Sequence, residues 1–215
     1  MPMEILWQDR ELVVCLKPSG VLSEEGEGAM PALLREATGA REIYCVHRLD
    51  RETGGLMVYA KTKGAAASLS AAIAQGQLEK RYLAVLSATP AEARGTLRDL
   101  LYRDARKNKS YVVQRLRRGV REAELRYELL ETQGELSLVQ VELVTGRSHQ
   151  IRVQFASRGL PLVGDGRYGG SCRDWGLALW SASLAFPHPQ SGQILRFTAP
   201  PPATEPWTRF EKIIR

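Results

Sequence analysis

One stretch, residues 45–60, constrains the fold and the chemistry of this chain more than any other. Five of the six residues from His47 to Glu52 are ionisable, and the Thr-Gly-Gly breaker that follows them, residues 53–55, is predicted to form a turn. The apolar run at residues 56–60 is then typical of a buried strand. A polar loop that leads into a buried strand gives its side chains a rigid support, as a catalytic carboxylate requires. The same pattern also fits a surface turn with solvated charges, so the loop by itself leaves both interpretations open.

The bulk composition is that of an ordinary globular protein. The 215 residues, 44% hydrophobic and 25% charged, suffice for one large domain or two small ones. No apolar run approaches the ~18 residues of a membrane span, and the N-terminus lacks a basic region followed by an apolar stretch. We therefore expect neither a membrane segment nor a secretory leader.

Cysteine usage and charge point to a compartment and to a class of partner. Cys15, Cys45 and Cys172 are odd in number and far apart, which favours a reducing cytoplasm over a disulfide framework. The net charge of +6 and the pI of about 9.4 suit a polyanionic partner without requiring one.

The order of the predicted elements indicates an α+β protein rather than a doubly wound α/β protein. Many strands occur, antiparallel where their pairing can be deduced, with three or four helices between them. Strands are predicted at 12–16, 56–60, 82–86, 122–130, 136–144, 177–186 and 193–198. Helices are predicted at 30–38, 64–75 and 148–157, with a final amphipathic turn at 207–214.

A basic run occupies residues 103–121. It contains eight basic side chains and one acidic side chain, Asp104. Such a run is either a solvated hairpin or an electrostatic arm along a phosphate backbone. Arg115, Arg117 and Arg118 are its candidates for binding a nucleic acid.

The common catalytic motifs are absent from the sequence. It contains no GxGxxG phosphate loop, no Walker lysine, no Gly-x-Ser-x-Gly elbow and no HExxH pair. A zinc site on His47 and His149 is disfavoured by their spacing. His149 is better explained as a capping or hydrogen-bonding histidine at the start of a helix.

Asp50 remains as the candidate for chemistry. Arg48 and Arg51 flank it, and nearby cations favour its ionised form. An ionised loop aspartate acts as a nucleophile, a base or an electrostatic stabiliser. A second cationic motif covers residues 147–152, and Arg152 lies one turn past its serine, where it could reach a buried carboxylate. The pattern therefore suggests covalent or acid/base chemistry on a nucleic acid.

Five ordered segments, spread over about two hundred residues, resemble the motifs of the RluA-type pseudouridine synthases. Any one of them would be weak evidence, but together they are specific. Residues 44–56 resemble the signature HRLDxxTSG, 80–85 resemble KxYxAxV, 144–153 resemble TGRxHQIRVH, 164–169 resemble GDxxYG, and 184–197 resemble LxFxHPxTGxxLxF. The opening residues 9–20 also resemble DxxLLVVNKPxG.

Three positions depart from the family pattern. Gly54 stands where the family often has Ser, Gln154 where it usually has His, and Trp180 where His is common. None of them is a candidate catalytic residue. The first catalytic motif starts within ten residues of the N-terminus, so the S4 RNA-binding domain of many relatives is not expected.

The resemblance implies one catalytic domain over residues 1–215 with the pseudouridine synthase fold. That fold is a mixed, mainly antiparallel sheet with flanking helices and a central active-site cleft. The implied reaction isomerises uridine in structured RNA to pseudouridine, with the base flipped out of its stack. Neither a cofactor nor a metal is implied.

The resemblance also implies roles for particular residues. Asp50 is the essential carboxylate, Tyr82 stacks on the uracil, and Arg152 pairs with Asp50. Arg48 holds the RNA backbone or fills the gap left by the flipped base. Arg147 and Gln150 are weaker candidates, for RNA contacts or for structural ones.

Two other functions remain as alternatives. One is a non-catalytic RNA-binding protein or RNA chaperone on the same fold, and the other is a hydrolase that uses Asp50 on another glycosidic bond. The partner is expected to be ribosomal or transfer RNA, which no motif separates. A monomer acting in the cytoplasm is the expected form.

Overall fold

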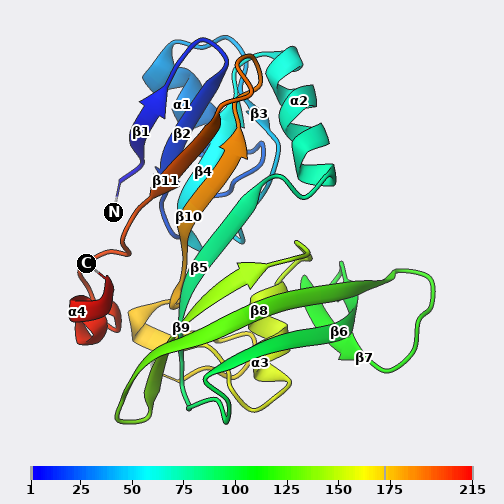
Figure 1. The fold of residues 1–215 in the computed structure, drawn as a ribbon, viewed down its shortest axis with the longest axis vertical. Coiled ribbons are helices and arrows are strands. Elements are labelled where there is room, and N and C mark those ends of the chain that lie inside the picture. Colours follow the sequence, from blue (N-terminus) through cyan, green and yellow to red (C-terminus); the bar gives the residue numbers. More distant parts are fainter. Residues whose placement is uncertain (1, 172, 215) are drawn as a thin grey trace. The chain divides into compact units, whose positions relative to one another are not determined.

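The computed structural model describes residues 2–171 and 173–214, and Cys172 lies outside them. The chain forms two compact units (Figure 1). The first unit comprises Met1–Lys80 and Trp180–Pro201, and the second comprises Arg81–Leu179 and Pro202–Arg215. No helix in the described part of the chain is long and apolar enough to cross a membrane.

The first unit is a mixed sheet with two helices, and its strand order is β1-β2-β4-β10. β3 also pairs with β4, and β11 pairs with β10. All of these pairs are antiparallel except β4 with β10, which is parallel. The elements are β1 (Glu4–Gln8), β2 (Leu12–Lys17), α1 (Met30–Thr38), β3 (Tyr44–Cys45), β4 (Gly54–Ala60), α2 (Lys63–Ala74), β10 (Leu179–Pro187) and β11 (Ile194–Thr198).

Strands β2 and β4 form the core of this unit, because every residue in both is buried. Their near-continuous apolar sequences fit a sheet that is covered on both faces. Helix α1 begins and ends as predicted, with Pro31 in its first turn and Gly39 in the left-handed conformation at its end.

The second unit contains an antiparallel sheet of order β5-β9-β8-β6-β7. A small apolar cluster of Leu101, Ala123 and Val153 joins the sheet to α3. The elements are β5 (Glu79–Leu86), β6 (Arg94–Asp104), β7 (Lys109–Val113), β8 (Val120–Gln133), β9 (Leu136–Leu143), α3 (Gln150–Ala156), α4 (Glu211–Ile214) and two 3-10 turns (Arg173–Trp175 and Trp207–Phe210).

The α+β class and the mixed, mainly antiparallel sheet are confirmed, while four strands, β1, β3, β6 and β7, were not predicted as strands. β1 and β3 are short, and β6 is interrupted by charged side chains. In the structure Arg94 and Arg98 of β6 lie opposite Glu128 and Glu124 of β8, and each pair is hydrogen-bonded. Cross-strand pairing of opposite charges thus accounts for a strand whose own sequence has little apolar alternation.

The basic run at residues 103–121 forms a hairpin followed by a loop. Its first part closes β6 and makes β7, which pair antiparallel. Residues 114–119 then connect β7 to β8.

Candidate active site

The loop between β3 and β4 holds Asp50, and hydrogen bonds fix the backbone on both sides of it. The Ser23 hydroxyl donates to the Leu49 carbonyl at 2.9 Å. The Ser19 hydroxyl donates to the Glu52 carbonyl at 2.6 Å. Asp50 itself is half-buried. A backbone held in this way restricts the positions that the Asp50 carboxylate can take.

The turn at this site lies earlier than the sequence predicts. Residues 50–53 make the turn, since the Thr53 N–H donates to the Asp50 carbonyl at 3.1 Å. Gly54 and Gly55 belong to β4. Gly55 has φ of +115°, and a Cβ there would lie 2.4 Å from the carbonyl oxygen of Ser181 on β10. The prediction of a turn at residues 53–55 is therefore wrong, because the glycines serve the close approach of β10 to β4.

Lys17 is a part of this site that sequence reasoning missed. It is fully buried at the end of β2. Its ammonium donates three hydrogen bonds, to the carbonyls of Pro18 at 2.9 Å, Val21 at 2.7 Å and Arg51 at 3.0 Å. Lys17 thus ties the loop after β2 to the residue that follows Asp50. The sequence signal is the Lys17-Pro18 pair in the opening segment at residues 9–20. Pro18 by itself predicts only a turn.

Lys17 also places a positive charge near the Asp50 loop. Burial lowers the pKa of Lys17 to about 8, and the carboxylates of Glu52 and Asp50 act in the opposite direction. At neutral pH the side chain therefore stays mainly protonated. A buried ammonium with three carbonyl partners has the hydrogen bonds that its burial demands.

The two arginines that flank Asp50 in the sequence are engaged with other groups. Arg48 makes an ion pair with Glu24 at 2.9 Å, and both side chains are exposed. The Arg51 Nε donates to the Gly20 carbonyl at 2.8 Å. An exposed ion pair contributes about 0–1 kcal/mol, so Arg48 can exchange Glu24 for a phosphate at small cost.

His47 has a structural role rather than that of a metal ligand. Its Nε2 accepts a hydrogen bond from the Val58 N–H at 3.1 Å, which attaches the loop to β4. Burial, and to a smaller extent the charge of Lys80, lower the pKa of His47 to about 3. Within residues 2–171 and 173–214, no group of three or more His, Cys, Asp or Glu side chains is arranged to hold a metal ion.

Tyr82 and Arg152, the other two predicted catalytic residues, lie in the second unit. Tyr82 is buried on β5 and faces Val141 of β9 across the strand pair. Arg152 is buried in α3. Regular elements therefore hold both side chains, whereas a loop carries Asp50.

Arg152 pairs with a buried carboxylate, as the sequence suggested, and Asp165 supplies one such carboxylate. The Nε and Nη2 of Arg152 donate to the two carboxylate oxygens of Asp165 at 2.8 and 2.9 Å. Asp165 also accepts from the backbone N–H groups of Arg167 and Tyr168. The GDxxYG segment thus supplies a carboxylate to which sequence reasoning gave no role. Pairing of Arg152 with Asp50 stays a prediction.

Gln150 organises the loop that leads into α3. Its Oε1 accepts from the Thr145 hydroxyl at 2.8 Å and from the Arg147 N–H at 2.9 Å. Its Nε2 donates to the Glu124 carbonyl at 3.0 Å. Gln150 and Arg147 are the two candidates in this loop for RNA contacts or structural contacts. Gln150 is buried and makes structural contacts, while Arg147 is exposed. The Arg147 Nε donates to the Glu122 carbonyl at 2.9 Å.

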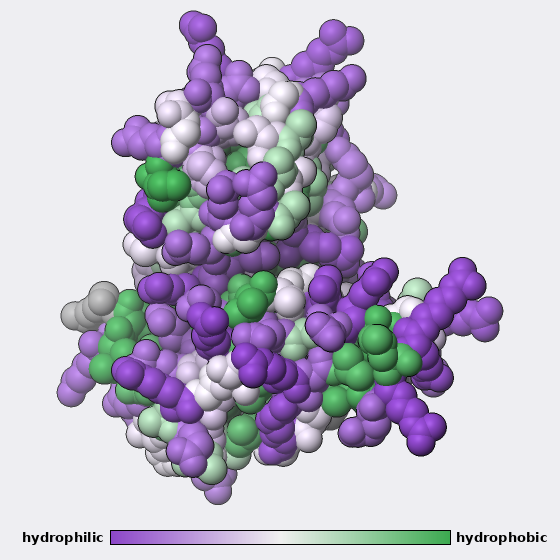
Figure 2. Space-filling model, turned by 45° about the vertical axis from the view of Figure 1, so that its right-hand side comes forward, coloured by the Kyte–Doolittle hydropathy of each residue, from purple (hydrophilic) through white to green (hydrophobic). Residues whose placement is uncertain are grey.

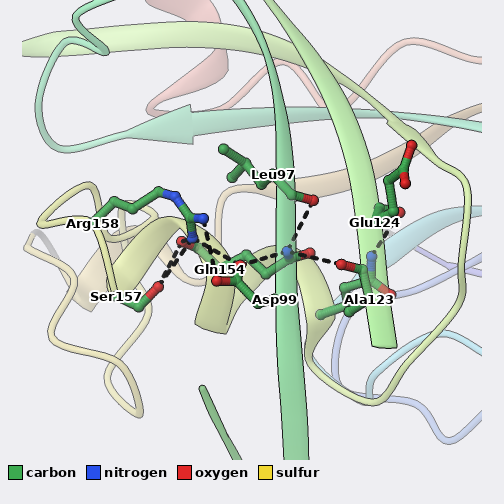
Figure 3. Close-up of polar contacts among 8 residues, drawn as sticks. Leu97, Asp99, Ala123, Glu124, Gln154, Ser157 and Arg158 are labelled. Carbon is green, nitrogen blue, oxygen red and sulfur yellow. Dashed lines mark hydrogen bonds and ion pairs between the residues drawn. The ribbon is translucent and has the colours of Figure 1, made fainter. Parts of the chain in front are cut away.

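Gln154, one of the departures from the family pattern, joins α3 to the sheet. It is fully buried between β6 and β8 (Figure 3). Its Nε2 donates to Asp99 at 2.7 Å and to the Leu97 carbonyl at 3.2 Å. Asp99 in turn pairs with Arg158 at 2.8 Å. This network fixes the helix that carries Arg152.

His149 is a hydrogen-bonding histidine at the start of α3, which is one of the two roles expected for it. Its side chain makes no cap hydrogen bond, although the residue adopts the left-handed conformation at the helix start. Its Nδ1 instead lies 2.9 Å from the Tyr168 hydroxyl. The same hydroxyl accepts from the Ser110 N–H at 2.8 Å, so His149 helps to attach α3 to β7.

The remaining predicted RNA-binding residues are on the surface. Arg115, Arg117 and Arg118 are exposed in the loop at residues 114–119. Arg117 lies over the ring of Tyr102, 5.2 Å from its centroid.

Comparison with protein families identifies the chain. The model of the RNA pseudouridylate synthase family matches residues 11–157. That stretch includes the Asp50 loop, β5 and α3. The chain belongs to this family. It is an RluA-type pseudouridine synthase, as the resemblance implied.

Similar proteins carry the same description. An uncharacterized RNA pseudouridine synthase of Synechocystis sp. is 33% identical over 100% of this chain and 68% of its own length. The ribosomal large subunit pseudouridine synthase C of Vibrio cholerae is 34% identical over 91% of this chain and 65% of its own length.

Solved structures support the fold. Human RNA Pseudouridylate Synthase Domain Containing 4 superposes with a TM-score of 0.78 at 25% identity, covering 93% of this chain and 88% of that chain. Human RNA Pseudouridylate Synthase Domain Containing 1 gives a TM-score of 0.80 at 24% identity, covering 94% and 84%. The pseudouridine synthase fold is thereby confirmed.

The family assigns the class of reaction. The pseudouridine synthase is an isomerase that acts on RNA. A non-catalytic RNA-binding protein on the same fold is not favoured by these relatives.

Proposed function

We propose that this pseudouridine synthase isomerises specific uridines of structured ribosomal RNA, with Asp50 as its essential carboxylate and without a cofactor. The observation that carries the proposal is the fixed backbone on both sides of Asp50, where carbonyls accept from the Ser23 and Ser19 hydroxyls. Such anchoring is unnecessary for a solvated surface turn and suits a carboxylate that must meet one atom of a substrate.

The reaction exchanges one bond to the sugar for another. The bond between C1′ and N1 breaks, the detached uracil turns, and a bond forms between C1′ and C5. The C5 proton leaves and N1 gains a proton, so the RNA keeps its mass. Asp50 acts on the sugar as a nucleophile or a base. Tyr82 stacks on the uracil, and Arg152 keeps Asp50 ionised and oriented.

Other residues capture the RNA. Arg48 binds the backbone or fills the place of the flipped base, and Arg147, Arg115, Arg117 and Arg118 bind phosphates. Gln150 supports this surface from within its loop.

Ribosomal RNA, more than transfer RNA, is the proposed substrate because relatives such as the Vibrio cholerae protein are named for the large ribosomal subunit. The family match runs through parts of both compact units, which supports a single catalytic domain over residues 1–215. We propose that it acts as a monomer in the cytoplasm.

The test combines a substitution with a map of modified sites. Pseudouridines are mapped in cellular RNA with the gene, without it, and with the gene encoding Asp50→Asn. We expect at least one ribosomal site to disappear without the gene and to stay absent with Asp50→Asn. RNA affinity of the purified variant should be nearly unchanged, because the substitution keeps the size of the side chain. Normal modification by Asp50→Asn would overturn the assignment of Asp50. Release of free uracil from the RNA would indicate a hydrolase.

A further inference from the structure

Leu116 is the most exposed large hydrophobic side chain in the described part of the chain. It is 69% exposed in the loop that connects β7 to β8. The other exposed large hydrophobics are Leu6, Leu22, Val144, Ile194 and Ile213, at 38–51%. A single exposed leucine is ordinary on a protein surface, so its surroundings must decide whether it has a role.

Positive charge surrounds this leucine. Arg115 precedes it, and Arg117 and Arg118 follow it. Within residues 2–171 and 173–214, no carboxylate forms an ion pair with these three arginines. The loop therefore presents an apolar tip within a group of cations that a polyanion could neutralise.

The loop is held in shape by its own contacts. The Val120 N–H donates to the Arg117 carbonyl at 3.0 Å, and Val120 is buried at the start of β8. Gly119 takes φ of +85°, and the Tyr102 ring lies beside both Gly119 and Arg117. A loop that is already ordered loses little conformational entropy when it binds.

The loop at residues 145–150 (TGRSHQ), which leads from β9 into α3, is hydrogen-bonded to the same end of β8. The Arg147 Nε donates to the Glu122 carbonyl, two residues after Val120. The N–H groups of Val144 and Thr145 both donate to the Glu124 carbonyl. Both loops are therefore attached to the first five residues of β8. Figure 2 shows hydrophobic surface bordered by long hydrophilic side chains on the side of this unit to which β6 and β7 belong.

We infer that Leu116 is an apolar wedge that inserts between bases of the bound RNA while the neighbouring arginines neutralise the adjacent phosphates. Proteins that deform nucleic acids commonly insert a leucine, isoleucine or phenylalanine between base steps and hold the backbone with arginines. A wedge at the end of β8 to which the loop at residues 145–150 is attached opens the stack near the motif that carries Arg152, which aids the extrusion of a base. The inference rests on the proposed function, since it takes RNA as the substrate.

The test uses the full chain and a synthetic RNA hairpin with 2-aminopurine in its loop, because that base fluoresces more strongly when it is unstacked. Affinity and fluorescence change are measured over a range of salt concentrations for wild type, Leu116→Ala and Leu116→Phe. Ile213→Ala is the matched control, since Ile213 is a 47% exposed apolar side chain of the same unit, in α4.

We expect Leu116→Ala to weaken binding about 10-fold, as for the loss of part of the free energy of burying a leucine side chain, and to lose most of the fluorescence increase. Its salt dependence should not change, because every charge is retained. Leu116→Phe and Ile213→Ala should behave like wild type.

An unchanged affinity or an unchanged fluorescence increase for Leu116→Ala would overturn the wedge. So would RNA binding that stays intact while a protein partner is lost, because the leucine would then be a protein-binding residue. This readout requires no turnover, so it is independent of the pseudouridine map. Normal modification by Leu116→Ala with unaltered RNA binding would remove the wedge and leave the proposed function in place.

Discussion

The Asp50 loop and the loop at residues 114–119 are both polar and both assigned to the same RNA, yet they are held in different ways. Around Asp50, buried groups reach the backbone from several directions, with Lys17 fully buried and Ser23 buried beneath the loop. In the second loop the arginines are exposed, and order comes from one turn hydrogen bond and the Tyr102 ring.

The difference fits the roles that we propose for the two loops. Chemistry depends on distances of a few tenths of an ångström, so a reacting carboxylate gains from rigid support. Attraction to phosphates acts over about 10 Å at ordinary salt and tolerates small movements. Changes in the Asp50 region should therefore alter rate and stability, and changes in residues 114–119 should alter binding.

The largest effect should come from Lys17→Met. This change removes three hydrogen bonds that join the loop after β2 to Arg51. We expect kcat to fall about 100-fold, as for a misplaced catalytic group, while RNA affinity stays near wild type. Single-turnover kinetics and a binding titration measure the two quantities.

Lys61→Met provides the control for that result. The Lys61 ammonium also donates to a backbone carbonyl of the first unit, that of Asp9, at 2.7 Å. Lys61 follows the C-terminal end of β4, whereas the Asp50 loop precedes its N-terminal end. Equal rate losses in the two variants would mean that Lys17 acts only through general stability.

Gly54→Ser tests the packing beneath the Asp50 turn. A Cβ at Gly54 would lie 2.6 Å from the Trp180 ring, so the added atoms overpack this contact. We expect the free energy of unfolding to fall by about 2–3 kcal/mol, measured by urea denaturation. In a Trp180→His background the cost of the serine should be smaller, because the smaller ring leaves room. Strictly additive changes in the free energy of unfolding would mean that positions 54 and 180, which the structure places in contact, do not influence each other.

Replacing Arg115, Arg117 and Arg118 together with Gln tests the other side of the comparison. Loss of three phosphate contacts should weaken RNA binding about 30-fold at low salt and reduce the slope of log affinity against log salt by about 2. The free energy of unfolding should stay within about 0.5 kcal/mol of wild type, as for surface changes. A salt slope equal to that of wild type would mean that these arginines do not bind phosphates and that the segment is only a solvated hairpin.

The smallest effect concerns acid stability through His47. Its pKa in the folded protein is about 3, below the ordinary value, so the unfolded chain binds the proton more readily. Stability should thus fall as the pH drops below about 6.5, with a loss of about 2 kcal/mol between pH 7 and pH 5. Urea denaturation at the two pH values measures it. His47→Gln keeps an acceptor for the Val58 N–H and should show a smaller pH dependence; equal slopes would exclude His47 as the source.

The sequence by itself determined the class of the fold and the family. The apolar runs of β2 and β4 are continuous, Pro31 and Gly39 bound α1, and alternation marks β8. These signals are local, so they survive without knowledge of the partners. The motif around Asp50 likewise carries its spacing in the sequence.

Only the tertiary structure decided which side chains support the site. Lys17 precedes Arg51 by 34 residues and Asp165 follows Arg152 by 13, and neither pairing has a local period. β6 escaped prediction because its charges are balanced by glutamates on β8. The sequence could name a charged loop before a buried strand, but burial creates the demand for hydrogen-bond partners, and burial is a property of the folded chain.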